Sequence, residues 1–510
     1  MKLNRIVIHG TKARNKMAKG ANFLADSVKI TLGPFGQNWF LDKKNAITND
    51  GAKIAQEIVL KDEVENRGVV ALREATRKTN DEAGDGTTTA TTLAQAIYAK
   101  AVRLLGDEEE GIIGKITPAE LIRQIETERK EVEEKLIAMA EPIETEEQLI
   151  KSAIVSVEDP ALGKLIGETQ FKLGKEAVLL AEETAERSSS IELVAGIRMD
   201  NGLGTAEVIN NQEKQQLEVE DSRVILTNQT LQDLGPLQKV IEQLSRSGVT
   251  TLTIVARAFT SEAIQICLKN INNAKMKIYP LNAPYVDQAE IMKDLAAVLG
   301  GTFFHSEERA IQDMQISDVG YASKIVARRY DAVLAGKTDD KSKERIAKRI
   351  EELHEKLKGS KSDFEKKALQ SRIAQLQNGF GIVRVGSDSE LERRRLFDKC
   401  EDGVNAVRAA YQEGVVPGAG LAFKTISESL PDTYLLKQPL LSIYEQIKSL
   451  APSGWEPEDW VKDPVKVLRI ALKNACLAAG TFATAGGVIT AENVKPRMVE
   501  EVSKQEEDEE

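Results

Sequence analysis

The chain has 510 residues, a formal net charge of −11, and a composition that is 41% hydrophobic, 29% charged and 5% aromatic. This length predicts two to four domains, and the negative charge argues against a generic binder of nucleic acids or anionic membranes. No apolar run approaches the roughly 20 residues of a membrane helix, the N-terminus has no signal-peptide core, and the cysteines lie far apart, so we expect a cytoplasmic protein with no nucleic-acid or membrane partner.

The N-terminal part of the chain is predicted to be helical. Apolar residues recur at spacings of three and four over residues 13–32, and Gly33 and Pro34 then end that helix. The runs NWFL and AIT predict two short strands, which a helix follows. A clear amphipathic helix comes after residues 84–89, and helical periodicity continues over residues 118–140.

The middle of the chain has an α/β pattern. From about Ser152, short strand-like runs such as SIELVAG and TTLTIVARA alternate with helices, which are predicted over residues 231–246, 261–270 and 287–299. Residues 341–378 predict an αα-hairpin. Three glycines flank this middle block, where we favour simple turns over hinges: Gly196, Gly379 and Gly381.

The C-terminal part is helical again. The run FGIVRVG predicts a strand, helices are predicted from Leu391 onward, and GVVPGAG at residues 414–420 interrupts them. Residues 500–510 are acidic and are predicted to be disordered.

The stretch GDGTTTA, residues 84–90, is the strongest candidate site. Unpaired N–H groups at a helix start bind phosphate, glycines let the backbone come close, and threonine hydroxyls add donors. Asp85 would repel a phosphate unless Mg²⁺ lies between them. The stretch alone leaves an alternative open, in which Thr87 caps the helix and Asp85 is a turn residue.

Other residues could complete such a site. The loop TLGPFG at residues 31–36 and the segment 414–420 let backbone approach a ligand, although either could be a tight turn. Asp50 and Asp402 could orient an attacking water, although single aspartates more often cap helices. A P-loop is absent, because Asp331 stands where the Walker motif needs its first glycine. A metal site or triad built on histidine is not expected, since the histidines and cysteines do not cluster.

Five motifs, taken together and in order, resemble those of bacterial-type (group I) chaperonins. They are TLGPFG, ITNDGA, KTNDEAGDGTTTATTLAQAI, CEDGVNAVRAAYQEGVVPGAG and VKDPVKVLRIAL. The resemblance covers nearly the whole chain and is strong at both ends and weak in the middle. The phrase ATTLAQAI favours group I over the archaeal and eukaryotic group.

The resemblance implies a multi-domain chaperonin fold of α and α/β domains. A mostly helical equatorial domain that binds ATP would comprise residues 1–138 and 413–510. A small α/β intermediate hinge domain would comprise residues 139–194 and 381–412, and an α/β apical domain, residues 195–380, would bind unfolded client proteins. Relatives form homo-oligomeric rings of seven subunits, in one or two rings, and a lid co-chaperonin is left open as a further partner.

The resemblance also implies roles for residues of the motifs, with ATP, Mg²⁺ and K⁺ as cofactors. Asp85 would hold Mg²⁺, Asp402 would position the attacking water with help from Asp50, and Gly418 and Asp463 would contact the ribose. The remaining residues would line the nucleotide or hold its phosphates: Thr31, Leu32, Gly33, Pro34, Gly86, Thr87, Thr88 and Thr89.

The sequence departs from the family pattern at several positions. Asn49 stands where lysine is common, and Pro417 and Ala419 interrupt the glycine run. The stretch 421–463 is shorter than in the family and lacks an asparagine–alanine–alanine segment that helps hold the base. In the family it also carries contacts between rings. We therefore expect an altered base pocket and a weakened or absent contact between rings.

The predicted client-binding surface consists of apolar residues on one strand segment and two helices. Glu207 and Lys269 interrupt it, and the alternative is that most of these residues are ordinary core. The residues are Leu203, Val208, Leu234, Leu237, Ile241, Ile264 and Leu268.

Three hypotheses follow for the function. The first is an ATP hydrolase that folds unfolded proteins in a ring-shaped chamber, which the presence of Asp50, Asp85 and Asp402 favours. The alternative is a chaperonin-derived ring that binds proteins with weak or lost ATPase activity. An unrelated phosphotransferase has no small-substrate motif to support it.

Overall fold

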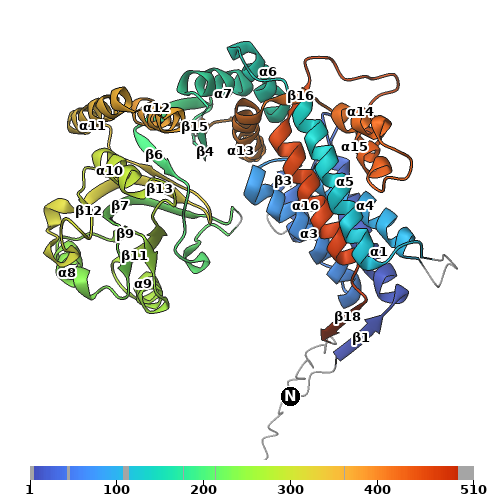
Figure 1. Cartoon of the computed structure of the whole chain (residues 1–510), viewed down its shortest axis with the longest axis horizontal. Helices are drawn as coiled ribbons and strands as arrows, with labels where there is room; N and C mark the ends of the chain where they lie inside the picture. The colour runs from blue at the N-terminus through green and yellow to red at the C-terminus, as the bar shows by residue number, and fades with distance from the viewer. Residues whose placement is uncertain are drawn as a thin grey trace, which may run out of the picture. The chain divides into compact units, whose positions relative to one another are not determined.

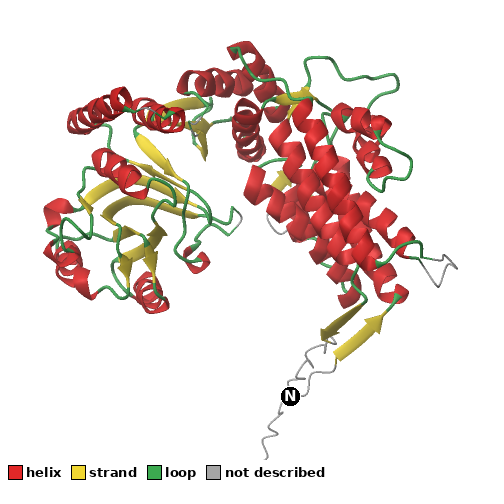
Figure 2. Ribbon diagram, viewed as in Figure 1, coloured by secondary structure: helices red, strands yellow, loops and turns green. Residues whose placement is uncertain are grey.

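The computed structural model describes residues 5–42, 46–106, 114–175, 177, 179–212, 214–360 and 362–491. The chain divides into two compact units (Figures 1 and 2). The helical unit comprises Met1–Ala140, Val416–Asp459 and Val465–Glu510, and the mixed unit comprises Glu141–Val415 and Trp460–Pro464. The predicted arrangement of helical ends around an α/β middle is confirmed. The acidic residues 500–510 lie outside the described residues.

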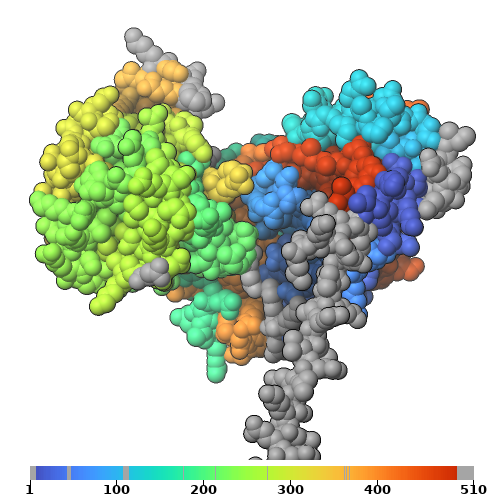
Figure 3. Space-filling view, turned by 90° about the horizontal axis from the view of Figure 1, so that it is seen from below, coloured from blue at the N-terminus to red at the C-terminus, as the bar shows by residue number. Residues whose placement is uncertain are grey.

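The helical unit is a bundle of long helices. Helix α16 packs against α3, α4 and α5, and α1 packs against α3. In the space-filling view part of α16 (red) reaches the surface beside α5 (cyan) (Figure 3). The long helices are α1 (Thr11–Val28), α3 (Glu63–Ala83), α4 (Thr87–Leu105), α5 (Pro118–Ala138) and α16 (Val465–Ala483). Shorter helices are α2 (Gly51–Glu57), α14 (Leu421–Ser429) and α15 (Lys437–Leu450).

Short strands complete the helical unit. β2 (Trp39–Leu41) and β3 (Ala46–Thr48) are the two predicted short strands, and they pair antiparallel. β1 (Arg5–His9) pairs antiparallel with β18 (Gly487–Ala491), so the N-terminal segment is joined to the C-terminal one. Neither β1 nor β18 was predicted, because the partner of each five-residue strand lies at the other end of the chain.

Among the described residues, the two largest sheets of the protein lie in the mixed unit. The large sheet has the strand order β11-β9-β7-β13-β14-β6, with β12 added on β7. Its strands are β6 (Gly196–Met199), β7 (Leu217–Thr227), β9 (Thr251–Ala256), β11 (Lys277–Asn282), β12 (Phe303–Phe304), β13 (Gly320–Ala327) and β14 (Ala332–Ala335). The strands β11, β9 and β7 are parallel, whereas β7, β13, β14 and β6 are antiparallel. The helices of this part are α8 (Gln238–Arg246), α9 (Ser261–Asn273), α10 (Gln288–Leu299), α11 (Asp340–Gly359) and α12 (Asp363–Asn378), and the last two confirm the αα-hairpin.

The small sheet has its own hydrophobic core. It has the order β4-β15-β5, formed by β4 (Leu179–Glu183), β15 (Phe380–Val385) and β5 (Ser190–Val194). Helices α6 (Glu146–Val157), α7 (Pro160–Leu173) and α13 (Glu390–Glu413) accompany it. Leu149, Ile166, Val383 and Val407 belong to this core, which is separate from the core of the large sheet.

Two predictions for this region are wrong. The strand-rich texture expected from about Ser152 begins only after α7, because Thr145 and Gln148 form a capping box for α6 and Asp159 caps α7 ahead of Pro160. The helix predicted over residues 231–246 begins only at Gln238. Before it, β8 (Thr230–Leu231) pairs with β10 (Ala258–Phe259), and a 3₁₀ turn, Gly235–Leu237, contains the proline.

The chain crosses between the two sheets at two points that lie side by side. Phe380 of β15 pairs with Val194 of β5. The chain leaves the small sheet directly after Val194 and returns to it directly before Phe380, so the two crossings are neighbours. Gly379 ends α12 with φ 62°, a conformation that glycine adopts without strain. The turns expected at Gly196 and Gly381 are wrong, because these residues lie in β6 and β15.

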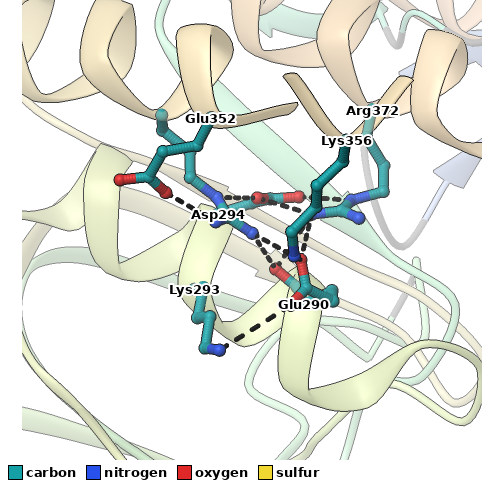
Figure 4. A network of polar contacts seen from close by, with 7 residues as sticks. Glu290, Lys293, Asp294, Glu352, Lys356 and Arg372 are labelled. Carbon is teal, nitrogen blue, oxygen red and sulfur yellow. Dashed lines mark hydrogen bonds and ion pairs between the residues drawn. The ribbon is translucent and has the colours of Figure 1, made fainter. Parts of the chain in front are cut away.

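A buried network of charges joins the αα-hairpin to α10 (Figure 4). Asp294 of α10 is 2% exposed and accepts hydrogen bonds from Arg349 and Arg372, each at 2.7 Å. Glu290, one turn earlier, accepts from Arg349 at 2.9 Å and from Lys356 at 2.7 Å. Burial alone would raise the pKa of Glu290, but the hydrogen bonds and charges of Lys356 and Arg349 outweigh it and lower that pKa to about 2.

Among the residues that the structure describes, no helix combines the length and the apolar character needed to cross a membrane.

Replacement of Asp294 should destabilise the large-sheet part of the mixed unit. Asp294→Ala leaves two buried guanidinium groups with too little negative charge, which costs about 3–5 kcal/mol of unfolding free energy. Lys293→Ala is the matched control, because Lys293 lies on the same helix and its contact with Glu290 is long, at 3.7 Å, and exposed. Urea unfolding gives the unfolding free energy of each variant, and hydrogen exchange of α11 and α12 shows where stability is lost. Equal effects of the two substitutions would contradict a structural role of the network.

Candidate functional site

The N-terminus of α4 is shaped by two left-handed glycines. Gly84, with φ 70°, ends α3, and Gly86, with φ 80°, is the N-cap residue of α4. The N-cap residue Gly86 has no side chain with which to cap α4, whereas Asp62 caps α3 with two hydrogen bonds. Thr87 is therefore the first helical residue, and the alternative in which it caps the helix is excluded. The first turn of α4 can thus direct backbone N–H groups and partial positive charge toward an anion.

Three segments that are distant in sequence meet at this helix start. The Thr31 hydroxyl lies 3.4 Å from the Thr88 hydroxyl and donates to the Val28 carbonyl at 2.9 Å. A Cβ on Gly51 would lie 2.5 Å from the Thr88 hydroxyl and 3.3 Å from the Thr87 hydroxyl, so only glycine fits there. The structure therefore brings together the loop after α1, the start of α2 and the threonines of α4.

The two candidate site aspartates of the helical unit, Asp50 and Asp85, accept hydrogen bonds from backbone N–H groups. Asp85 accepts from the Gly86 N–H at 2.5 Å. Asp50 is the N-cap of α2 and accepts from the Ala52 N–H at 2.7 Å, while its own N–H donates to the Thr48 hydroxyl at 3.1 Å. The capping role of Asp50, which sequence analysis weighed as an alternative, is thus present. Its part in handling water stays a prediction.

The loop at residues 31–36 is packed by residues that sequence analysis did not single out. Gly33 faces Ile447 of α15, and the ring of Phe35 meets Trp455 edge-on with centroids 5.1 Å apart. Helix α15 is in turn anchored by the buried Glu128, which accepts from the backbone N–H groups of Leu435 and Leu436 at 3.0 and 2.8 Å. Trp455, an aromatic residue on the shortened stretch 421–463, was the signal that could have been noticed.

The remaining predicted residues fall in two places. Gly418 lies in the helical unit, between β16 (Val415–Pro417) and α14, where its carbonyl accepts from the Leu421 N–H. Asp402 lies on α13 and Asp463 on β17 (Lys462–Pro464), and both belong to the mixed unit. Their roles toward a nucleotide stay predictions.

The seven residues predicted to bind clients differ in exposure. Leu203, Val208, Leu234 and Leu237 are buried in the cores of the large-sheet part, which favours the core interpretation for these four. The other three are half-buried: Ile241, Ile264 and Leu268. A surface built from them would expose little apolar area in this conformation. Their role in client binding stays a prediction.

The described residues contain no group of three or more histidine, cysteine, aspartate or glutamate side chains that could hold a metal ion. Asp85 alone is nevertheless a sufficient protein ligand for Mg²⁺ when phosphate oxygens and water supply the rest of the octahedron. The donors at the start of α4 therefore fit a magnesium–phosphate group better than a metal held by the protein alone.

Comparisons with known proteins identify relatives along most of the chain. The model of the TCP-1/cpn60 chaperonin family matches residues 24–434. The chaperonin GroEL of Acholeplasma laidlawii is 33% identical over 462 residues, which are 89% of this chain and 84% of that protein.

Solved structures show a similar fold. The chaperonin gp146 of the Pseudomonas aeruginosa bacteriophage EL, crystallised in the presence of ATP-BeFx, is 20% identical, with TM-scores of 0.67 and 0.58 in two crystal forms. The first of these alignments covers 96% of this chain and 99% of that one, and the second covers 95% and 99%.

Filling the space beside Thr88 should impair this site. Gly51→Ala places a methyl group 2.5 Å from the Thr88 hydroxyl, so the start of α4 must shift. We expect the affinity for inorganic triphosphate to fall at least tenfold and the unfolding free energy to fall by about 1–3 kcal/mol. Isothermal titration calorimetry and urea unfolding measure the two effects. Gly486→Ala is the control, because a Cβ there meets open space. Unchanged triphosphate affinity in Gly51→Ala would exclude this part of α4 as the anion site.

Proposed function

The chain belongs to the TCP-1/cpn60 chaperonin family, and from this premise we propose that it hydrolyses Mg-ATP at the start of α4 to drive the folding of client proteins. As a chaperonin it binds nucleotide and assists protein folding. The single observation that carries the proposal is the convergence of Thr31, Gly51 and Thr88 at a helix N-terminus that no side chain caps.

The phosphates are proposed to lie against the first turn of α4. The N–H groups of Gly86, Thr87, Thr88 and Thr89 and the threonine hydroxyls are suited to donate to phosphate oxygens. Asp85 would hold Mg²⁺, which neutralises phosphate charge when bound. The loop of Thr31, Leu32, Gly33 and Pro34 would line the nucleotide, and Gly418 and Asp463 would contact the ribose. K⁺ is proposed as a further cation.

Hydrolysis is proposed to need residues of both units. Asp402 would orient the attacking water, and Asp50 would assist it. Asp50 and Asp85 belong to the helical unit, and Asp402 belongs to the mixed unit. The alternative, a ring with weak or lost ATPase activity, is not favoured, because all three aspartates are present.

The chaperonin family assembles into rings and binds clients, and we propose a ring of seven copies of this chain. Exposed apolar residues on both short sheets of the helical unit support self-association. Val7 and Ile489 face each other across β1 and β18 and are 59% and 67% exposed, and Phe40 of β2 is exposed as well. The shortened stretch 421–463 suggests a single ring, while a lid co-chaperonin and a cytoplasmic location stay predictions.

Clients are proposed to meet the large-sheet part of the mixed unit. Ile241, Ile264 and Leu268 would form the accessible part of that surface. Leu203, Val208, Leu234 and Leu237 would contribute only after a rearrangement that exposes them, because they are buried in the structure.

Loss of the Asp402 carboxylate should stop hydrolysis while ATP still binds. We expect Asp402→Ala to lower kcat at least a hundredfold and to change ATP affinity less than threefold, because the carboxylate acts on water and not on the phosphates. A steady-state phosphate-release assay and calorimetry with Mg²⁺ and K⁺ present separate the two. Equal kcat in the native protein and the variant would remove Asp402 from the mechanism, and an inert native protein would favour the alternative function.

A charge on the exposed strand pair should weaken assembly. Val7→Asp places a carboxylate opposite Ile489, and its desolvation in an interface would raise the dissociation constant at least tenfold. Sedimentation velocity measures the particle size over a dilution series. Val59→Asp, at a residue of the same unit that is 68% exposed and outside both sheets, should assemble as the native protein does. Identical behaviour of Val7→Asp and the native chain would place the interface elsewhere.

A further inference from the structure

A lysine from the large-sheet part of the mixed unit contacts α13 directly before Asp402. Lys214 lies in a short turn between Asn211 and Gln216, which pair with each other ahead of β7. Its ammonium nitrogen lies 2.9 Å from the Glu401 carboxylate and 4.2 Å from the centroid of the Phe397 ring. Phe397 and Glu401 are four residues apart, on one face of α13. One cation therefore contacts a full turn of the helix through two independent interactions.

The Lys214 contacts are shielded from water. The Lys214 and Glu401 side chains are 24% and 26% exposed, which strengthens an ion pair relative to one on an open surface. The attraction between the ammonium group and the ring of Phe397 adds to the ion pair. The Lys214 side chain thus contacts Phe397 and Glu401, which lie at the two ends of one turn of α13, and it restrains that turn.

The other side of the same turn packs against α6. Gly403 has no side chain, and a Cβ there would overlap the Val157 side chain of α6. Cys400 and Val404 are buried in the core of the small sheet. Asp402 therefore lies on a turn of α13 that α6 supports from one side and Lys214 from another.

We propose that Lys214 is a positioning residue for hydrolysis, which fixes the turn of α13 that carries Asp402. This inference rests on the proposed function, and in particular on the role of Asp402. Lys214 belongs to the part of the chain that holds the predicted client surface, and only the two crossings beside Gly379 connect that part to α13 through the backbone. The side chain of Lys214 therefore gives the large-sheet part a direct influence on the geometry of Asp402. A second ion pair, between Lys324 of β13 and Glu182 of β4, joins the two sheets without contacting α13.

The test compares Lys214→Ala, Lys214→Arg and Arg395→Ala in steady-state ATP hydrolysis by the full chain. We expect Lys214→Ala to lower kcat about tenfold with KM and ATP affinity within twofold of the native values, because the phosphate site is untouched. Lys214→Arg keeps the charge and the contact with the ring and should restore kcat to within threefold. Arg395→Ala is the control, because it also removes one positive charge. Arg395 pairs with Glu392 within α13, so the kcat of this variant should match the native value.

A double-mutant cycle distinguishes positioning from a general loss of stability. If Lys214 acts through Glu401, Lys214→Ala, Glu401→Ala and the double variant should have similar kcat values. Hydrogen exchange of residues 398–403 should be faster in Lys214→Ala than in Arg395→Ala. Unchanged or increased kcat in Lys214→Ala, or failure of Lys214→Arg to restore it, would overturn the inference while leaving the proposed function intact. A native protein that binds no ATP would overturn both.

Discussion

The absence of a side-chain cap on α4 is the constraint around which the helical unit is arranged. The N-cap residue of α4, Gly86, has no side chain to accept from the first N–H groups of the helix, and N–H groups at a helix start are suited to bind an anion. Gly51 lets α2 approach Thr88, Gly86 lies against Val467 of α16, and Thr31 contacts Thr88 from the loop after α1. Segments from α2, from α16 and from the loop after α1 thus define a site that no single segment of the chain could form.

In the proposed reaction, each of the two units contributes different residues. The helical unit supplies the phosphate donors and the metal ligand, and the mixed unit supplies Asp402. Within the mixed unit, the large and small sheets have separate cores and are joined by adjacent backbone crossings and by ion pairs. Ion pairs of intermediate burial suit such a junction, because they are strong enough to favour one arrangement and can still exchange partners. The buried network of Asp294, Arg349 and Arg372 serves the opposite purpose and makes the αα-hairpin and α10 one rigid piece.

The predicted helices and strands are confirmed where the residues of the segment itself carry the pattern. The helix after residues 84–89, the αα-hairpin and the strands β5 and β9 each carry their own pattern, and each is found in the structure. The predictions are wrong or missing where a distant partner decides the conformation, as for β1, β18 and β8. They are also wrong where helix caps favour a helix in a segment that was expected to form strands, as for α7. The burial of Leu203 and Leu234 follows the alternative in which they are core, and the sequence left this open because an amphipathic pattern does not reveal which face another element covers.

The pairing of β1 with β18 also has a consequence for how the chain folds during synthesis. The mixed unit is almost one continuous stretch, Glu141–Val415, so it can complete its cores as soon as that stretch has left the ribosome. The helical unit needs α16 against α3 and α4, and β18 against β1, so its first residues must wait for the last ones. Helices α1, α3 and α4 can pack on one another early, but the faces of α3 and α4 that contact α16 stay uncovered until α16 has been made. A chaperonin, which assists the folding of other proteins, therefore passes most of its own synthesis with part of its helical core incomplete.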